Sequence, residues 1–155
     1  MHIERPGYLE KLISKRVKYY FSVIGLRNAR LNFRQQEENH IMENIIYNDL
    51  VIRAFDVDVG SIEYNFKNKD GISQRSQPEV DFVANKESKR YYIQSAFSVS
   101  EEEKRRQETN SLYRIKDSFK KIVVVKDAII PWHDDRGVLY IGIEQFLLDE
   151  SAIDL

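Results

Sequence analysis

Three residues with oxygen-bearing side chains interrupt apolar patterns in this 155-residue chain: Glu43, Asp81 and Gln94. Asp81 stands between Val80 and Phe82, and strand alternation predicts that it lies on the face opposite to both of them. A carboxylate in such a strand is costly to bury, so it usually has a partner or a task. Two carboxylates and an amide provide the hard oxygen ligands that magnesium prefers, and a metal held in this way can activate water for phosphodiester cleavage.

Three elements must position these residues. Residues 78–98 predict a hairpin with its turn at 85–89, and residues 37–54 predict a long helix from the spacing of their apolar residues. Four β-branched residues within 121–126 predict a strand that is covered on both faces. The other expected elements are strands at 17–23, 56–66 and 138–141, helices at 8–15, 101–119 and 143–148, a turn or short helix at 26–33, a turn at 68–71, and polar loops at 74–77 and 131–137.

This order of elements predicts an α/β fold with a mixed central β-sheet flanked by helices, in one domain over residues 1–155. Hydrophobic residues make up 42% and charged residues 32% of the chain, which excludes a disordered or a membrane composition. No apolar run approaches the roughly 20 residues of a membrane span. Because cysteine is absent, disulfides and thiolate zinc sites are excluded. We expect a cytoplasmic protein without membrane partners.

The net charge of −1 hides a basic flank between residues 11 and 34 that contains no acidic residue. It consists of Lys11, Lys15, Arg16, Lys18, Arg27, Arg30 and Arg34. Such a flank can contact the phosphates of DNA or an acidic protein surface. The alternative is a solvated flank that the acidic helix after it balances in the fold.

The acidic residues and their surroundings resemble the PD-(D/E)XK nuclease superfamily. Glu43 in a helix, the segment Glu-Val-Asp-Phe-Val at 79–83 and the segment Ile-Gln-Ser-Ala at 93–96 carry the resemblance. More narrowly, the chain resembles the C-terminal domain, of unassigned function, that follows the P-loop module in many prokaryotic AAA-type ATPases. That likeness covers residues 8–148, and its matching stretches are 18–29, 42–50, 79–84, 92–94, 111–117 and 146–148.

The resemblance implies a restriction-endonuclease-like fold, an ATPase module as the partner within a longer parent protein, and a magnesium site at Glu43 and Asp81 with Gln94 beside them. This chain departs from the nuclease pattern, because the expected acid-any-lysine triplet reads Gln94-Ser95-Ala96. The Gln94 oxygen can still ligate a metal, but Ala96 removes the catalytic ammonium. A second departure is Val23, where the family more often has an acidic residue.

The resulting expectation is an accessory ATPase domain without catalysis, which needs no cofactor and binds DNA or a protein. The alternative is a magnesium-dependent nuclease that uses Glu43, Asp81 and Gln94 with a lysine supplied from elsewhere. A third reading is a purely structural module in which Asp81 only accepts hydrogen bonds. Weaker candidates are a metal site at His40 and Glu43 or at 133–135, a replacement lysine at Lys86, Lys89 or Lys104, and a basic helix face at 104–106 with Arg114 and Lys116. No P-loop motif occurs, so ATP binding of that kind is not expected of this chain.

Overall fold

The computed structural model describes residues 18–23, 25, 38–67, 71, 73–96 and 109–155. Within them a six-stranded sheet has the order β1-β4-β5-β6-β8-β7, and a two-stranded ribbon joins β2 to β3. The strands are β1 (Asp56–Ser61), β2 (Tyr64–Lys67), β3 (Ser73–Ser76), β4 (Glu79–Lys86), β5 (Lys89–Ala96), β6 (Lys120–Val125), β7 (Trp132–His133) and β8 (Leu139–Gly142). The helices are α2 (Glu38–Ile52), α4 (Ile143–Leu148) and the 3-10 helix η1 (Glu150–Asp154), and residues 109–113 are also helical.

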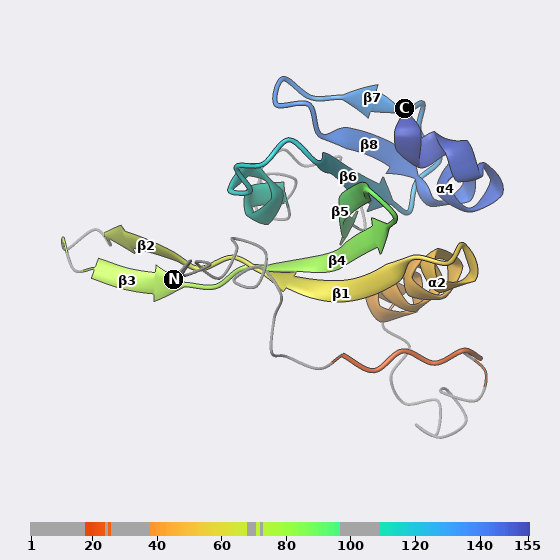
Figure 1. The fold of residues 1–155 in the computed structure, drawn as a ribbon, viewed down its shortest axis with the longest axis horizontal. Helices are drawn as coiled ribbons and strands as arrows, with labels where there is room; N and C mark the ends of the chain where they lie inside the picture. The colour runs from red at the N-terminus through yellow and green to blue at the C-terminus, as the bar shows by residue number, and fades with distance from the viewer. Residues whose placement is uncertain (1–17, 24, 26–37, 68–70, 72, 97–108) are drawn as a thin grey trace, which may run out of the picture.

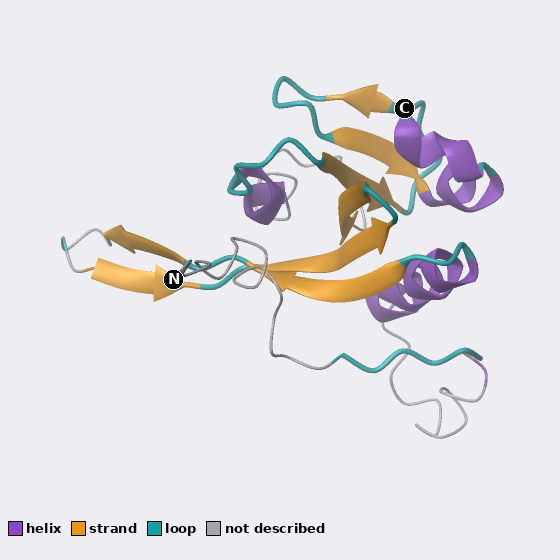
Figure 2. Cartoon of the chain, in the orientation of Figure 1, coloured by secondary structure: helices purple, strands orange, loops and turns teal. Residues whose placement is uncertain are grey.

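The sheet is mixed in strand direction (Figure 1). β1, β4 and β5 form an antiparallel meander, β6 is parallel to β5, and β8 is parallel to β6. β7 closes the far edge against β8 in the antiparallel direction. The ribbon of β2 and β3 projects from the body of the molecule between β1 and β4, and helices lie against the sheet (Figure 2). The expected α/β fold with a mixed, helix-flanked sheet is therefore confirmed.

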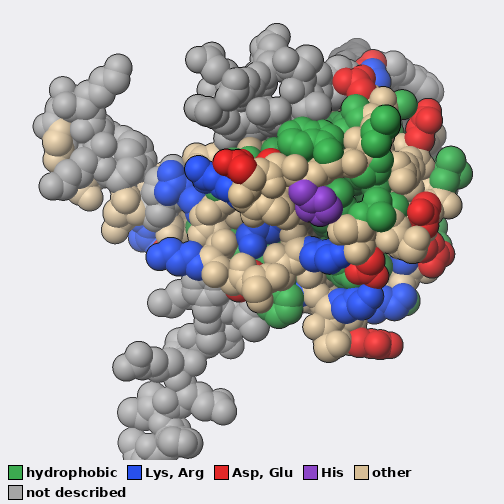
Figure 3. Space-filling model, turned by 90° about the horizontal axis from the view of Figure 1, so that it is seen from above, with side chains coloured by type: hydrophobic (Ala, Val, Ile, Leu, Met, Phe, Trp, Pro, Cys, Tyr) green, Lys and Arg blue, Asp and Glu red, His purple; other side chains and the backbone are tan. Residues whose placement is uncertain are grey.

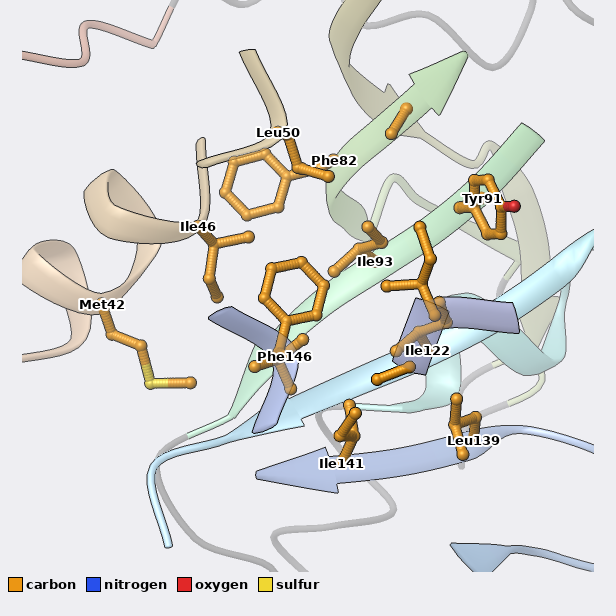
Figure 4. Close-up of a cluster of buried hydrophobic side chains, with 14 residues drawn as sticks. Met42, Ile46, Leu50, Phe82, Tyr91, Ile93, Ile122, Leu139, Ile141 and Phe146 are labelled. Atoms are coloured by element: carbon orange, nitrogen blue, oxygen red, sulfur yellow. The ribbon is translucent and has the colours of Figure 1, made fainter. Parts of the chain in front are cut away.

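Each face of the sheet has its own apolar core. On the first face, α2, α4 and η1 cover β4, β5, β6 and β8 (Figure 4). On the second face, the helical residues 109–113 and the residues after them cover the same strands, with Leu112 fully buried. β6 serves both cores, because Ile122, Val123, Val124 and Val125 are all inaccessible to solvent. This agrees with the expectation of a strand covered on both faces.

α2 forms where its apolar residues recur every four positions. Met42, Ile46 and Leu50 lie in the first core and anchor the helix to the sheet. Beyond the end of α2, the buried Arg53 donates from Nη2 to the carbonyl of Phe146 at 2.6 Å, which ties the helix to α4. The rigid attachment of α2 to the sheet fixes the position of every side chain on the helix.

Five predicted elements differ from the structure. Residues 18–23 form no strand, because the backbone of Phe21 is bound by side chains of α2 and not by a neighbouring strand. The strand expected at 56–66 is divided into β1 and β2, and the polar segment expected as a loop at 74–77 pairs with β2 as β3. Backbone pairing in a ribbon needs no apolar side chains, so the apolar pattern did not reveal β3. The loop expected at 131–137 contains the short strand β7.

The helix expected at 101–119 is also shorter at its end, since residues 115–119 are not helical. Beyond the end of this helix, the Asp117 side chain accepts from the amide of Phe119 at 3.2 Å and from the hydroxyl of Tyr92 at 2.6 Å. An aspartate that binds its own downstream backbone competes with helix formation. Residues 1–17, 26–37 and 97–108 lie outside the described part, as do the elements expected there. No helix in the described ranges is long and apolar enough to cross a membrane.

Candidate functional site

A β-bulge places Asp81 at the start of β4. Asp58 of β1 pairs with Val83 and Gly60 pairs with Val80, so one β1 residue faces both Asp81 and Phe82. The bulge breaks strand alternation, because Val80 lies in the second core and Phe82 in the first. The prediction that Asp81 lies opposite to both neighbours is therefore wrong.

The carboxylate of Asp81 bridges the point where β4 and β5 separate. The β4–β5 ladder ends at Phe82 and Ile93, although both strands continue beyond these residues. Asp81 Oδ2 accepts from the Ser95 amide at 2.9 Å, from the Ser95 hydroxyl at 3.2 Å and from Gln94 Nε2 at 2.8 Å. The Gln94 oxygen in turn accepts from the Asp81 amide at 3.4 Å. The two residues predicted as site partners on neighbouring strands are thus in direct contact.

The third predicted residue, Glu43, reaches the same place from α2. The link is Lys18, whose Nζ lies 3.1 Å from Asp81 Oδ1, 3.6 Å from Glu43 Oε2 and 3.9 Å from Glu79 Oε2. We call Lys18, Glu43, Glu79 and Asp81 the acid cluster. Its side chains are mostly buried, with 24% of Lys18 and 9% of Asp81 exposed. The structure therefore brings Glu43, Asp81 and Gln94 together at one end of β4 and β5.

The charges of the acid cluster shift its pKa values. Burial by itself lowers the pKa of Lys18, but the carboxylates of Asp81, Glu43 and Glu79 outweigh burial and leave it above the ordinary value. Burial raises the pKa of Glu43, the charge of Asp81 raises it further, and Lys18 and His40 offset only part of this rise. Lys18 is thus protonated at neutral pH, whereas Glu43 holds a proton more tightly than an exposed glutamate.

The backbone around Lys18 is held on α2 by amide side chains. Asn44, 3% exposed, accepts from the Phe21 amide at 2.7 Å and donates to the Phe21 carbonyl at 2.7 Å, and Asn48 donates to that carbonyl at 2.8 Å. Tyr20 stacks on Tyr47 with ring centroids 4.2 Å apart. Residues 18–23, which we call the strap, therefore run along α2 (Figure 1). The contacts of Tyr20 and Phe21 fix the position of the strap on that helix.

The Tyr20 hydroxyl is buried beside the acid cluster. It has no hydrogen-bond partner among the described residues. Burial, followed by the charges of Glu43 and Asp81, raises the pKa of this hydroxyl far above its ordinary value. Tyr20 therefore remains a neutral phenol next to the carboxylates.

The predicted basic flank is only partly described. Lys18 points into the acid cluster and not onto a free basic surface. The face seen in Figure 3 carries Lys and Arg side chains interspersed with acidic ones over the described residues. The other predicted contact residues lie outside the described part of the chain: Lys11, Lys15, Arg16, Arg27, Arg30 and Arg34.

The lysines considered as replacements lie elsewhere. Lys86 donates to the carbonyl of Arg53 at 2.8 Å, and Lys89 donates to Asp154 at 2.7 Å, both at the turn end of the β4–β5 hairpin. Asp81 and Gln94 are at the opposite end of these strands. Lys104 falls in a segment that the structure does not describe. Within the part of the chain that the structure describes, Lys18 is the lysine whose ammonium pairs with Asp81.

The acid cluster does not fit magnesium as it is arranged. Glu43 and Asp81 offer hard oxygens, but Asp81 Oδ2 already accepts three hydrogen bonds and Oδ1 faces Lys18. The Gln94 oxygen faces the Asp81 backbone. Among the described residues, no group of three or more His, Asp or Glu side chains is placed to hold a metal ion, and this includes residues 133–135.

Sequence reasoning missed Lys18 as a site residue, and it missed Asn44. Lys18 is 63 positions from Asp81 in the chain and was counted only within the basic flank. Asn44 could have been noticed, because it is a polar residue within the helical segment that carries the apolar stripe. A buried asparagine on such a helix must find partners for its amide, which pointed to a nearby backbone segment.

Comparison with known proteins identifies a protein of similar sequence. The chain is similar to a protein of Haemophilus influenzae described as an uncharacterized protein, with 30% identity over 122 residues. The match covers 79% of this chain but 26% of the relative, so the chain spans about a quarter of that protein's length. No family model matches the chain, and no solved structure matches it.

Proposed function

We propose that this chain is an accessory C-terminal domain of a prokaryotic AAA-type ATPase, with a PD-(D/E)XK nuclease-like fold that binds a partner without cutting DNA. The observation that carries this proposal is the meeting of Glu43, Asp81 and Gln94 beside Lys18. The resemblance implied such a meeting of a helix acid with polar residues of two adjacent strands. The much longer relative is consistent with a module of a larger protein.

The charges in the acid cluster support the proposed lack of catalysis. Lys18 partly neutralises three carboxylates that a metal would otherwise bind, and Ala96 stands where the nuclease pattern has lysine. The cluster still has more negative than positive charge, so it repels phosphate in the absence of a metal. Contact with DNA would therefore depend on the basic flank at residues 11–34.

A gel shift with duplex DNA at rising salt tests the DNA-binding form of this proposal. Binding through phosphate contacts weakens steeply as salt increases. A gel shift that does not change with salt concentration, or no gel shift at all, contradicts DNA binding through phosphate contacts. Docking onto the ATPase core is then the remaining form of the proposal. The second form is tested by co-purification with the parent protein's ATPase module, expressed as a separate chain.

Lys18 favours one further candidate, a magnesium-dependent nuclease. Its ammonium lies 3.1 Å from Asp81, so it supplies the group that Ala96 lacks. In a nuclease, such an ammonium stabilises negative charge that develops on phosphate. Incubation of plasmid DNA with Mg²⁺ or Mn²⁺ tests this candidate, with Asp81→Ala as the control that must lose cutting. Intact plasmid with both metals eliminates it.

A further inference from the structure

The position of the Lys18 ammonium is the feature that the proposed function leaves unexplained. It lies within 3.1 to 3.9 Å of oxygens from Asp81, Glu43 and Glu79. These carboxylates come from two elements, α2 and β4, and all are at least partly buried. Like charges so close together in a low-dielectric site need a counter-charge. Lys18 provides that charge from within the chain.

The placement of Lys18 is determined by contacts that do not involve the carboxylates. Asn44 makes two hydrogen bonds of 2.7 Å with the backbone of Phe21, and Asn48 adds a third at 2.8 Å. Tyr20 is fixed by its stacking on Tyr47 and by a ring contact with Phe82. Because Phe21 is three residues from Lys18, these contacts restrict how far the ammonium can move.

We propose that Lys18 is an internal counter-ion that takes the place of a divalent cation in the acid cluster, with Asn44 as its positioning residue. This inference rests on the proposed nuclease-like arrangement of Glu43 and Asp81. It explains why Asp81 and Gln94 are fully engaged with protein groups and leave no oxygen directed into an open metal site. The strap thus places the Lys18 ammonium where a metal ion would bind, and the carboxylates need no metal to balance their charge.

Removal of Lys18 gives the direct test. The full chain and its Lys18→Met variant are titrated with Mn²⁺ by isothermal titration calorimetry, after circular dichroism has shown that both are folded. The carboxylates lose their counter-charge in the variant, so we expect it to bind Mn²⁺ at least about tenfold more tightly than the unmodified chain. Lys89→Met is the matched control, because Lys89 pairs with Asp154 at 2.7 Å at the turn end of the β4–β5 hairpin, opposite to the end that carries Asp81. Its affinity should equal that of the unmodified chain.

Asn44→Ser tests the positioning role and keeps the inference testable where Lys18→Met does not fold. It retains Lys18 but removes both carboxamide contacts with Phe21, so we expect a Mn²⁺ affinity between those of the unmodified chain and Lys18→Met. Ile46→Val destabilises the same helix without removing a hydrogen bond to Phe21, so it should leave Mn²⁺ affinity unchanged. An unchanged affinity in Asn44→Ser excludes the positioning role.

Equal Mn²⁺ affinities in the unmodified chain and in folded Lys18→Met would overturn the counter-ion assignment, and so would a failure of Lys18→Met to bind Mn²⁺. Neither result depends on DNA or on the ATPase module. The gel-shift and co-purification outcomes are therefore separate, and a failure of this inference can be distinguished from a failure of the proposed function.

Discussion

At the scale of single residues, Asp81 is a buried aspartate whose two carboxylate oxygens both accept hydrogen bonds. Its Oδ2 accepts from Ser95 and Gln94, while Oδ1 faces Lys18. Asp81→Asn keeps the shape of the side chain and removes the negative charge opposite Lys18. It can also place an amide NH2 group where the carboxylate accepts hydrogen bonds from Gln94 and Ser95. We expect the free energy of unfolding to fall by about 2 kcal/mol, measured by urea denaturation. The exposed Asp56→Asn on β1 should change it by less than about 0.5 kcal/mol, and an equal loss in both variants would contradict the assignment.

Glu43 makes stability depend on pH through its raised pKa. Burial raises this pKa most, and the charges of Asp81 on β4, Lys18 on the strap and His40 on α2 act on it as well. The folded chain binds this proton more tightly than the unfolded chain does. The contribution of Glu43 to the free energy of unfolding therefore increases as pH falls from neutral toward 4.5, and it decreases as pH rises.

Glu43→Gln removes this titration. We expect it to flatten the dependence of the melting temperature on pH and to raise stability at neutral pH relative to the unmodified chain. Thermal unfolding followed by circular dichroism at several pH values measures both effects. Glu144→Gln, at an exposed position on α4, should keep the original slope. A slope that Glu43→Gln leaves intact would show that other groups cause it.

At the scale of elements, the bulge between β1 and β4 depends on Gly60. A Cβ at this position would lie 3.0 Å from Val80 Cβ and 3.0 Å from Val83 Cγ2. Gly60→Ala therefore pushes β1 away from β4 beside Asp81. We expect a loss of about 1–2 kcal/mol in unfolding free energy, measured by urea denaturation. Gly25→Ala, whose Cβ would meet no atom of the described residues within 4 Å, is the control that should stay close to the unmodified chain.

The elements that the sequence predicted well are those that their own residues determine. The apolar stripe of 37–54 and the β-branched run of 121–126 correspond to α2 and β6 within two residues at either end. The resemblance also predicted that Glu43, Asp81 and Gln94 lie close together. The bulge and the placement of Lys18 could not be predicted in this way, because a register shift depends on the partner strand and Lys18 is positioned by Asn44 through Phe21.

At the scale of the whole molecule, the two cores share one sheet, so the site and the far edge should unfold together. Trp132, the only tryptophan in the chain, stacks on Tyr140 at 4.3 Å on edge strand β7, while Leu50 of α2 is fully buried beneath the opposite part of the sheet. β1 and β7 form the two edges of that sheet. A local change near Leu50 therefore reaches Trp132 only through cooperative unfolding of the chain.

Leu50→Ala creates a cavity in the first core and should lower the free energy of unfolding by about 3 kcal/mol. In a single cooperative domain, Trp132 fluorescence and far-ultraviolet circular dichroism give coincident urea transitions, and Leu50→Ala shifts both by the same amount. Val51→Ala, at an exposed position on the same helix, should shift neither by more than about 0.5 kcal/mol. A Trp132 transition that stays in place while the circular dichroism transition moves would divide the chain into two units. The proposal of one domain would then fail, because α2 and the acid cluster would belong to a unit that unfolds independently of β7 and β8.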